Sequence, residues 1–341
     1  MRLIVDAMGG DHAPEEIVLG AVRGKTEDPS LELILTGDEN AIREVMTRHG
    51  LSEEGVRIVH AESRIEMEED PICIIKGKRD SSMARALQLL RDGEGDALLS
   101  AGSTGALLVG CSSRIYKVKQ AGIRRCAIGT VLPLEKPTLL LDSGANIEVS
   151  PEEMVQLAHM GRAYMKGLYG LEEPEIALVN NGAEETKGTD NYVQCHAALK
   201  AEEGIRFVGN IEGRYIPLGG ADVILCDGFV GNVILKLSEG FGRFIKKQLT
   251  GIFSGFAGKL AGLLVYGRIK KLSSRLSYEK HGGAPLLGTV RPVIKAHGSS
   301  RAAAIESAVR QAKKCCESGV CDMIAAAFTK EKSHGSEDCK D

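Results

Sequence analysis

Residues 2–14 read RLIVDAMGGDHAP. An apolar run of strand length ends at an aspartate and is followed by two glycines, whose backbone freedom permits a tight turn. Similar runs recur along the chain, and LELILT (31–36) and DVILC (222–226) are apolar nearly throughout. Strands have this composition when both faces of their sheet are covered. The pattern therefore predicts a buried, mostly parallel β-sheet.

Strands are expected at residues 2–7, 31–36, 56–60, 96–100, 126–132, 138–143, 175–180, 205–208, 222–226 and 292–296. Helical patterns lie between many of them, for example at 41–50, 81–93, 151–168, 232–249 and 301–318. This alternation predicts an α/β fold with a doubly wound sheet, in which ligands bind beyond the carboxyl ends of the strands. We expect residues 1–328 to form one α/β domain and residues 329–341 to form a polar tail.

The composition excludes several classes of protein. Of the 341 residues, 43% are apolar and 26% charged, so the chain can bury a substantial core. A net charge of −3, no tryptophan and 4% aromatic residues argue against a nucleic-acid partner. Nine cysteines and an N-terminus without a signal-peptide pattern predict a reducing cytoplasm. The C-terminal cysteines lack the paired spacing of a zinc site, so no metal is expected.

Polar, glycine-rich segments follow the expected strands at residues 6–14, 100–106, 142–146, 180–188, 227–232 and 296–300. Six such loops suggest a shared crevice. The alternative is that each glycine only allows a tight turn between a strand and a helix. ATP-binding, simple dinucleotide-binding and serine-hydrolase motifs are missing, so those activities lose support.

The loop SAGSTGA (100–106) precedes a helical run. A glycine turn that leads into a helix exposes backbone N–H groups and the positive end of the helix dipole, which bind oxyanions. Ser103 and Thr104 either donate hydroxyl groups to such an anion or cap the helix. The loop AHGSS (296–300) before the next helical pattern repeats this arrangement.

Four further side chains have more than one reading each. Lys187, beside Glu184 and Glu185, is an anion clamp, an activated base or a solvated surface lysine. His297 protonates a leaving group, orients the substrate or has a structural role. Asn232 donates to a developing oxyanion or caps the following helix, and Asp227 lies at the other end of the same turn. Asp11 stands beside two glycines and either braces its loop or contacts the substrate.

Residues 240–278 contain eight basic residues and no acidic ones. On a helical wheel, the apolar residues of 249–264 form one stripe and four glycines form another. Three readings compete: a membrane-spanning helix, a core or dimer-interface helix, and an exposed helical hairpin that touches an anionic membrane surface. The basic residues also suit an acidic protein partner.

Ten motifs occur in a characteristic order: DAMGGD (6–11), RDSSM (79–83), SAGSTGA (100–106), GAN (144–146), EExKG (184–188), GNIEGR (209–214), DGFVGN (227–232), LKLSEG (235–240), GGAPLLG (282–288) and AHGSS (296–300). Together they resemble the bacterial phosphate acyltransferases of phospholipid synthesis. The resemblance covers about residues 6 to 300. One departure is Ser103, where the family usually has asparagine.

The resemblance implies a three-layer α/β/α sandwich similar to isocitrate and isopropylmalate dehydrogenases, with a protruding helical hairpin at 240–280. It implies transfer of a long-chain acyl group from acyl carrier protein to inorganic phosphate, without a cofactor. The acyl phosphate would feed an acyl-phosphate:glycerol-3-phosphate acyltransferase. Family members are cytoplasmic homodimers that associate peripherally with the inner face of the cell membrane.

On this resemblance we expect catalytic roles for Lys187, Asn232 and His297, with Asn232 as the oxyanion donor. Contacts to phosphate or the acyl group are expected from Asp11, Ser100, Gly102, Ser103, Thr104, Gly105, Asn146, Glu184, Asp227 and Ser299. Docking of the carrier or membrane is expected at Lys246, Lys247, Phe253, Phe256, Leu260, Arg268, Lys270, Lys271 and Arg275. The alternatives are a short-chain phosphotransacetylase that uses coenzyme A, a decarboxylating dehydrogenase and a membrane-associated scaffold.

Overall fold

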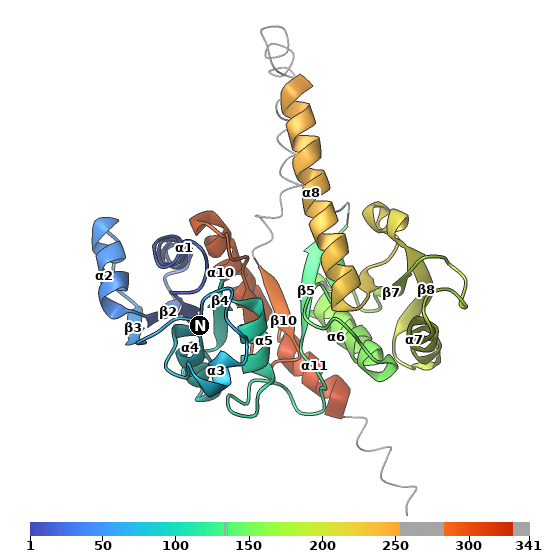
Figure 1. The fold of residues 1–341 in the computed structure, drawn as a ribbon, viewed down its shortest axis with the longest axis horizontal. Helices are drawn as coiled ribbons and strands as arrows, with labels where there is room; N and C mark the ends of the chain where they lie inside the picture. Colours follow the sequence, from blue (N-terminus) through green and yellow to red (C-terminus); the bar gives the residue numbers. More distant parts are fainter. Residues whose placement is uncertain (133, 135, 253–266, 268–282, 330–341) are drawn as a thin grey trace, which may run out of the picture.

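The computed structural model describes residues 1–132, 134, 136–252, 267 and 283–329. Its strands form one eleven-stranded sheet in the order β3-β2-β1-β4-β11-β10-β5-β6-β9-β7-β8 (Figure 1). A strand lies at each of the ten expected places. The additional strand, β10 (Ala284–Leu287), was not predicted, because Pro285 and the flanking glycines are typical of a turn.

One half of the sheet consists of five parallel strands. They are β1 (Arg2–Asp6), β2 (Glu32–Gly37), β3 (Val56–His60), β4 (Ala97–Ser100) and β11 (Val293–Lys295). Helices in this half are α1 (Glu15–Thr26), α2 (Glu39–Arg48), α3 (Cys73–Lys76), α4 (Ser82–Arg91), α5 (Thr104–Ser112) and α10 (Ala302–Glu317).

The other half contains β6 (Thr138–Leu141), β9 (Val223–Leu225), β7 (Glu175–Asn180) and β8 (Arg206–Glu212), again parallel to one another. Its helices are α6 (Pro151–Tyr169), α7 (Asp190–Ala201), the 3₁₀ helix η1 (Gly213–Leu218), α8 (Gly228–Ile252) and α11 (Val320–Thr329). Residues 330–341 of the expected tail lie outside the described residues.

Three antiparallel pairings join the two halves. β10 is antiparallel to β11 and to β5 (Ala127–Leu132), and β5 is antiparallel to β6. Three reversals in succession make the two sets of parallel strands run in opposite directions. The loops that follow the strands therefore form two groups, one in each half, which only a connecting element can join.

Helices cover both faces of the sheet. On β1, Leu3 and Val5 pack into a core shared with α1, α2 and α10, whereas Ile4 packs into a second core with α3, α4 and α5. This alternation along a strand is expected for a sheet between two helical layers. It also determines which face each polar residue at a strand end occupies.

The protruding element is α8, which rises away from the body of the molecule (Figure 1). It extends beyond both ends of the helix expected at 232–249. The rest of the expected hairpin lies outside the described residues. No helix in the described part of the chain is long and apolar enough to cross a membrane.

The closest helix pair in the first half is α1 with α10. A Cβ atom added at Gly20 of α1 would lie 2.4 Å from the Ala302 carbonyl oxygen and 2.6 Å from the Ile305 Cβ. Such distances are far below van der Waals contact. The two helices can therefore pack this closely only because residue 20 is a glycine.

We predict that Gly20→Ala destabilises the fold by about 1–3 kcal/mol, because the helices must separate to admit the methyl group. Denaturation in urea, followed by circular dichroism, measures the loss. Gly167→Ala in α6 is the matched control: the nearest neighbour of its added Cβ would be the Met323 sulfur at 3.4 Å, an ordinary contact. An unchanged midpoint for Gly20→Ala would contradict this account of the α1–α10 contact.

Candidate active site

A row of polar side chains crosses the first half of the sheet at the carboxyl ends of its strands. Asp6 of β1 pairs with Ser100 of β4, and Ser100 pairs with Lys295 of β11. Two positions before each of them, on the same strand, lies an apolar residue of the core beneath α3, α4 and α5. Because strand side chains alternate, all three project on this same face.

Asp6, at the β1 end of this row, is fully buried. Its carboxylate accepts hydrogen bonds from the hydroxyl groups of Ser82, at 2.6 Å, and Ser100, at 2.7 Å. Burial raises the pKa of Asp6, and the two serine hydrogen bonds oppose that rise. Asp6 thus ties the start of α4 to β1 and β4.

The loops after β1, β4 and β11 lie against one another. The Asp11 N–H donates to the Gly298 carbonyl oxygen at 2.9 Å. A Cβ atom at Gly9 would lie 2.7 Å from the Gly102 nitrogen. The Gly102 N–H donates to the Ser100 hydroxyl oxygen at 3.1 Å. Three of the six predicted loops are therefore brought together.

Helix α5 begins in this group of loops. The Ser103 hydroxyl oxygen accepts from the Ala106 N–H at 3.4 Å, so Ser103 is the N-cap of α5. Thr104 and Gly105 form the first turn, and a Cβ at Gly105 would lie 2.6 Å from Pro71. The first-turn N–H groups carry the positive end of the helix dipole. The capping role that the sequence left open is therefore present.

His297 stands between the loop after β11 and α8. Its Nε2 lies 3.3 Å from Lys236 Nζ, and its Nδ1 lies 2.9 Å from Ser299 Oγ. Partial burial lowers the pKa of His297, and the nearby positive charge of Lys236 lowers it further. The imidazole is therefore neutral at pH 7. This state suits orientation of a substrate better than protonation of a leaving group.

The second group of loops is organised by Asp142, directly after β6. Its buried carboxylate accepts hydrogen bonds from the N–H groups of Gly144, Ala145 and Asn146, at 2.8–3.0 Å. Burial raises the pKa of Asp142, against the effect of these hydrogen bonds. The Asn146 side-chain amide donates to the Asp142 carboxylate and to the Cys126 carbonyl oxygen. The N–H groups of this loop therefore hold it in place through their hydrogen bonds to Asp142.

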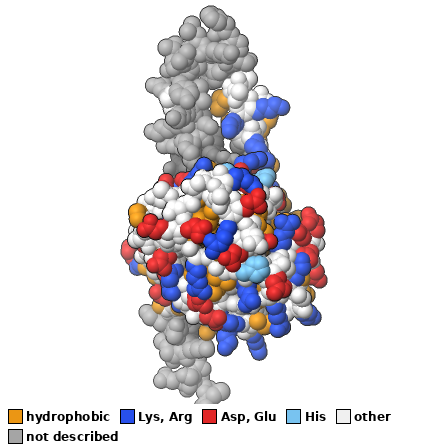
Figure 2. Space-filling view, turned by 90° about the vertical axis from the view of Figure 1, so that its left-hand side faces the viewer, with side chains coloured by type: hydrophobic (Ala, Val, Ile, Leu, Met, Phe, Trp, Pro, Cys, Tyr) orange, Lys and Arg blue, Asp and Glu red, His pale blue; other side chains and the backbone are white. Residues whose placement is uncertain are grey.

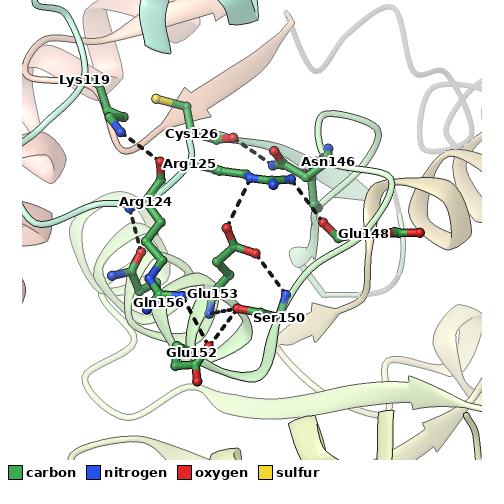
Figure 3. A network of polar contacts seen from close by, with 11 residues as sticks. Lys119, Arg124, Arg125, Cys126, Asn146, Glu148, Ser150, Glu152, Glu153 and Gln156 are labelled. Carbon is green, nitrogen blue, oxygen red and sulfur yellow. Dashed lines mark hydrogen bonds and ion pairs between the residues drawn. The ribbon is translucent and has the colours of Figure 1, made fainter. Parts of the chain in front are cut away.

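A polar network holds this loop from below (Figure 3). Arg125 lies between the Glu148 carbonyl oxygen, at 3.3 Å, and the Glu153 carboxylate, at 3.1 Å. Glu153 also accepts from the Ser150 N–H, completing a capping box at the start of α6. The network fixes α6 relative to the loop that contains Asn146.

Helix α8 starts in close contact with the same loop. The Gly228 N–H donates to the Asn146 carbonyl oxygen at 2.6 Å. A Cβ atom at Gly231 would lie 1.9 Å from the Asp142 carbonyl oxygen, so only glycine fits there. Asp227 caps the helix through the Val230 N–H, at 2.8 Å.

Tyr192 of α7 supports this cap. Its hydroxyl group donates to the Asp227 carboxylate at 2.6 Å and accepts from the Asp227 N–H at 3.2 Å. Burial raises the pKa of Tyr192, and the hydrogen bond to Asp227 raises it further. The hydroxyl therefore stays protonated and Asp227 remains fixed.

Helix α8 connects the two groups of loops. Asn232 is exposed and lies beside Gly144, where a Cβ would be 3.7 Å from its side-chain carbonyl carbon. Lys236, one turn further along, reaches His297. Residues four apart share a helix face, so Asn232 and Lys236 project toward the loops of opposite halves from one surface.

Lys187 and Glu184 lie in the loop after β7. Their side chains are 47% and 65% exposed, and their charged atoms are 4.0 Å apart. Asn180 donates to the Lys187 carbonyl oxygen at 2.9 Å, which fixes the backbone while the ammonium group stays in solvent. Among the described residues, Lys187 makes no hydrogen bond or ion pair with the loops of the first half.

Two residues of this region were not predicted from the sequence. Lys295 is buried beside Asp6, and Lys236 links α8 to His297. A signal for Lys295 existed: a lysine in the otherwise apolar strand PVIKA must project into the interior. Lys236 had none, because its position depends on how α8 crosses the sheet.

Of the expected docking residues, Lys246 and Lys247 are exposed on α8. The others, Phe253, Phe256, Leu260, Arg268, Lys270, Lys271 and Arg275, lie outside the described residues. Basic and hydrophobic side chains are both exposed along the visible part of α8 (Figure 2). The hydrophobic ones include Leu237, Phe241 and Phe244, each more than half exposed.

Thiol chemistry finds no support here. Cys226 is buried, and burial raises its pKa well above the ordinary value. Among the described residues, no group of three histidine, cysteine or acidic side chains is placed to hold a metal ion.

The chain is similar to known proteins over nearly its full length. The family model described as "Fatty acid synthesis protein" matches residues 1–323. The phosphate acyltransferase of Thermoanaerobacter pseudethanolicus is 42% identical over 330 residues, which cover 95% of this chain and 96% of that protein. The phosphate acyltransferase of Listeria welshimeri is 39% identical over 340 residues, which cover 99% of each chain.

Solved structures show the same fold at low sequence identity. A phosphotransacetylase from Streptococcus pyogenes has a TM-score of 0.61 at 16% identity, with 94% of each chain covered. A branched-chain phosphotransacylase from Enterococcus faecalis has a TM-score of 0.55 at 18% identity, covering 93% of this chain and 99% of that one.

We predict that Ser103→Ala lowers the free energy of unfolding by about 0.5–2 kcal/mol, because α5 loses its N-cap. Ser103→Asn should retain stability, since asparagine caps as well as serine. Urea denaturation checks both. If Ser103→Ala leaves the unfolding midpoint unchanged, the cap does not stabilise α5.

Proposed function

The chain belongs to the family of fatty acid synthesis proteins that includes the phosphate acyltransferases, and from this premise we propose that it transfers a long-chain fatty acyl group from acyl carrier protein to inorganic phosphate. The activity of an acyltransferase follows from the family. The carrier, the chain length and the residue roles are proposed.

The proposed reaction needs no covalent enzyme nucleophile. A phosphate oxygen attacks the thioester carbonyl carbon, the carbonyl oxygen becomes an oxyanion, and the C–S bond then breaks. The electron pair leaves with the carrier thiolate, whose conjugate thiol has a pKa of about 8.5 and needs little acid assistance. The protein therefore has to hold phosphate against the carbonyl, stabilise the oxyanion and exclude water.

The observation that carries this proposal is the contact of Lys236 with His297 at 3.3 Å. Through it, one face of α8 carries Asn232 beside the loop at 142–146 and Lys236 beside the loop after β11. We assign phosphate binding to the loops at 100–106 and 297–300 and to Lys187. The Asn232 amide is assigned to the oxyanion, and neutral His297 orients the phosphate.

The remaining candidates have supporting parts in this proposal. Ser100 and Gly102 shape the turn before α5, and Asp11 and Ser299 line its entrance with Thr104 and Gly105. Asn146 and Asp227 hold the start of α8, and Glu184 stands beside Lys187.

Helix α8 supports the choice of an acidic carrier as donor. Arg243, Lys246 and Lys247 are exposed on it, and a positive surface attracts an acidic protein across solvent. Its exposed Leu237, Phe241 and Phe244 suit an acyl chain or a second apolar surface.

We extend the proposal to the cellular setting that the resemblance implies. The protein works in the cytoplasm as a homodimer and meets the anionic inner face of the membrane through the segment 240–280. Its acyl phosphate is passed to an acyl-phosphate:glycerol-3-phosphate acyltransferase for phospholipid synthesis. We also propose, from the same resemblance, that the fold is related to that of isocitrate and isopropylmalate dehydrogenases.

A second candidate is a short-chain phosphotransacetylase-like enzyme that uses coenzyme A. The fold likeness to phosphotransacetylases favours it, although at 16% and 18% identity this likeness concerns the fold alone. The apolar and basic surface of α8 favours the larger, acidic donor.

The proposal is tested by incubating the protein with palmitoyl-acyl carrier protein and labelled phosphate, then trapping acyl phosphate as a hydroxamate. We expect phosphate-dependent product and an equal amount of free carrier thiol, and at least a hundredfold lower turnover in Lys187→Ala. Lys200→Ala is the matched control, because Lys200 is a nearby exposed lysine paired with Glu185 at 2.6 Å.

Product from acetyl-coenzyme A but not from the carrier thioester would favour the second candidate. If neither donor reacts while the folded protein still binds the carrier, a scaffold role replaces the proposed activity. Wild-type turnover in Lys187→Ala would remove its assignment.

We predict that reversing two charges on α8, Lys246→Glu with Lys247→Glu, raises the KM for acyl carrier protein about tenfold and leaves kcat nearly unchanged. The wild-type KM should also rise with salt, and the variant should respond less to salt. Lys166→Glu with Lys314→Glu, on α6 and α10, is the charge-matched control. An equal change of KM in both double variants would locate the effect in net charge rather than on α8.

A further inference from the structure

Lys295 is the most deeply buried cation near the site. Only 8% of its surface is exposed, although lysine side chains are normally in contact with solvent. Its neighbours on the same face of β11 and β4 are the core residues Val293 and Leu98. Burial of an ammonium group is costly unless charged or polar partners compensate it.

The compensation within the protein is incomplete. The Lys295 ammonium donates to the carbonyl oxygen of the adjacent Ala296. In the described part of the chain, no ion pair within 4.0 Å joins it to Asp6 or Asp11, which attract it from a greater distance. An ammonium group has three N–H donors. Donors therefore remain for a further acceptor.

The position of Lys295 indicates what this acceptor is. The strand pairing puts Lys295 beside Ser100, three residues before the cap of α5. Two residues after Lys295 comes His297, whose ring is held between Ser299 and Lys236. Three features that favour an anion therefore meet here: a buried ammonium, the first turn of α5 and the cation on α8.

We propose that Lys295 is a substrate-binding residue that donates directly to the phosphate nucleophile. The inference rests on the proposed function and deepens it, since it names the charge that binds the second substrate. Lys187, whose side chain is 47% exposed in the other half of the molecule, keeps its proposed contact with the same phosphate from that half.

Asp6 has a defined part in this arrangement. Its carboxylate is occupied by Ser82 and Ser100, which keeps it from forming a closed ion pair with Lys295. Its charge still favours the protonated lysine. Asp6 thus stabilises the charge of the Lys295 ammonium group, while the N–H donors of that group remain available to a ligand.

A pH dependence follows. Burial lowers the pKa of Lys295 to about 8, with Asp6 and Asp11 opposing the shift and Lys236 adding to it. The other titrating group that faces it is His297, whose lowered pKa keeps it neutral throughout this range. Phosphate binding should therefore weaken as the pH rises through 8, where Lys295 loses its proton.

The test compares the full-length protein with Lys295→Met, which keeps the length of the side chain and removes the charge. We expect the KM for phosphate to rise at least about tenfold and the KM for the carrier thioester to stay within about twofold. Between pH 7 and 9 the wild-type KM for phosphate should rise more steeply than that of Lys295→Met, which keeps only the pH dependence of phosphate ionisation itself. Lys136→Met is the control, because Lys136 pairs with Asp222 at 2.8 Å, away from the site.

A second measurement does not depend on turnover. Millimolar inorganic phosphate should raise the melting temperature of the wild-type protein and of Lys136→Met, but not that of Lys295→Met. If Lys295→Met does not fold, Lys295→Gln is used in both measurements. A wild-type KM for phosphate in the variant, or equal protection by phosphate, overturns the proposal.

The two proposals can fail separately. Absence of acyl phosphate with the wild-type protein would contradict the proposed function, whatever Lys295 does. Phosphate protection that is lost in Lys295→Met would still identify the anion site. A rise of the KM for the carrier alone would place Lys295 in the other substrate's site and overturn the assignment made here.

Discussion

The hydrogen bonds that Asp6 accepts from Ser82 and Ser100 are the interaction on which the first half of the molecule depends. They join β1, β4 and the start of α4 at one point, directly above the apolar core. Without these two donors the buried carboxylate would keep only the Met8 N–H and the more distant charge of Lys295, and poorly compensated buried charges are strongly destabilising. The loops after β1 and β4 therefore have fixed starting points, and the cap of α5 follows three residues after Ser100.

The second half depends on a contact of a different kind. Its parallel strands run opposite to those of the first half, so the loops after them do not reach the first group directly. Helix α8 crosses this gap because Gly228 and Gly231 let its backbone lie against the loop at 142–146. A side chain at Gly231 would tilt the helix away and move Lys236 from His297. The connection between the two halves thus depends on the absence of a side chain.

Much of this fold could be predicted from the sequence because strand and helix patterns are local. Ten strands and the glycine loops after them lie at the expected places. β10 could not be predicted, since GGAPLLG has the composition of a turn and becomes a strand only between β11 and β5. The opposite directions of the two parallel sets depend on that same strand. Lys236 could not be found for a related reason: its contact with His297 depends on the angle at which α8 leaves the sheet.

The charges at the site favour a particular ligand. Lys295 and Lys236 are positive, Asp6 is tied to two serines, and His297 is neutral because burial and Lys236 lower its pKa. A buried lysine of lowered pKa reduces the stability of the folded protein below pH 8, where the unfolded and folded chains both carry the proton but only the folded chain has desolvated it. That cost falls as the pH rises from about 8 toward the ordinary lysine pKa of 10.5, because there the folded chain loses the proton while the unfolded chain keeps it. An anion bound at Lys295 offsets the same cost at neutral pH. The buried ammonium group of Lys295 therefore does not serve to stabilise the fold through an ion pair. Its burial is explained if its hydrogen-bond acceptor is the phosphate that the reaction consumes.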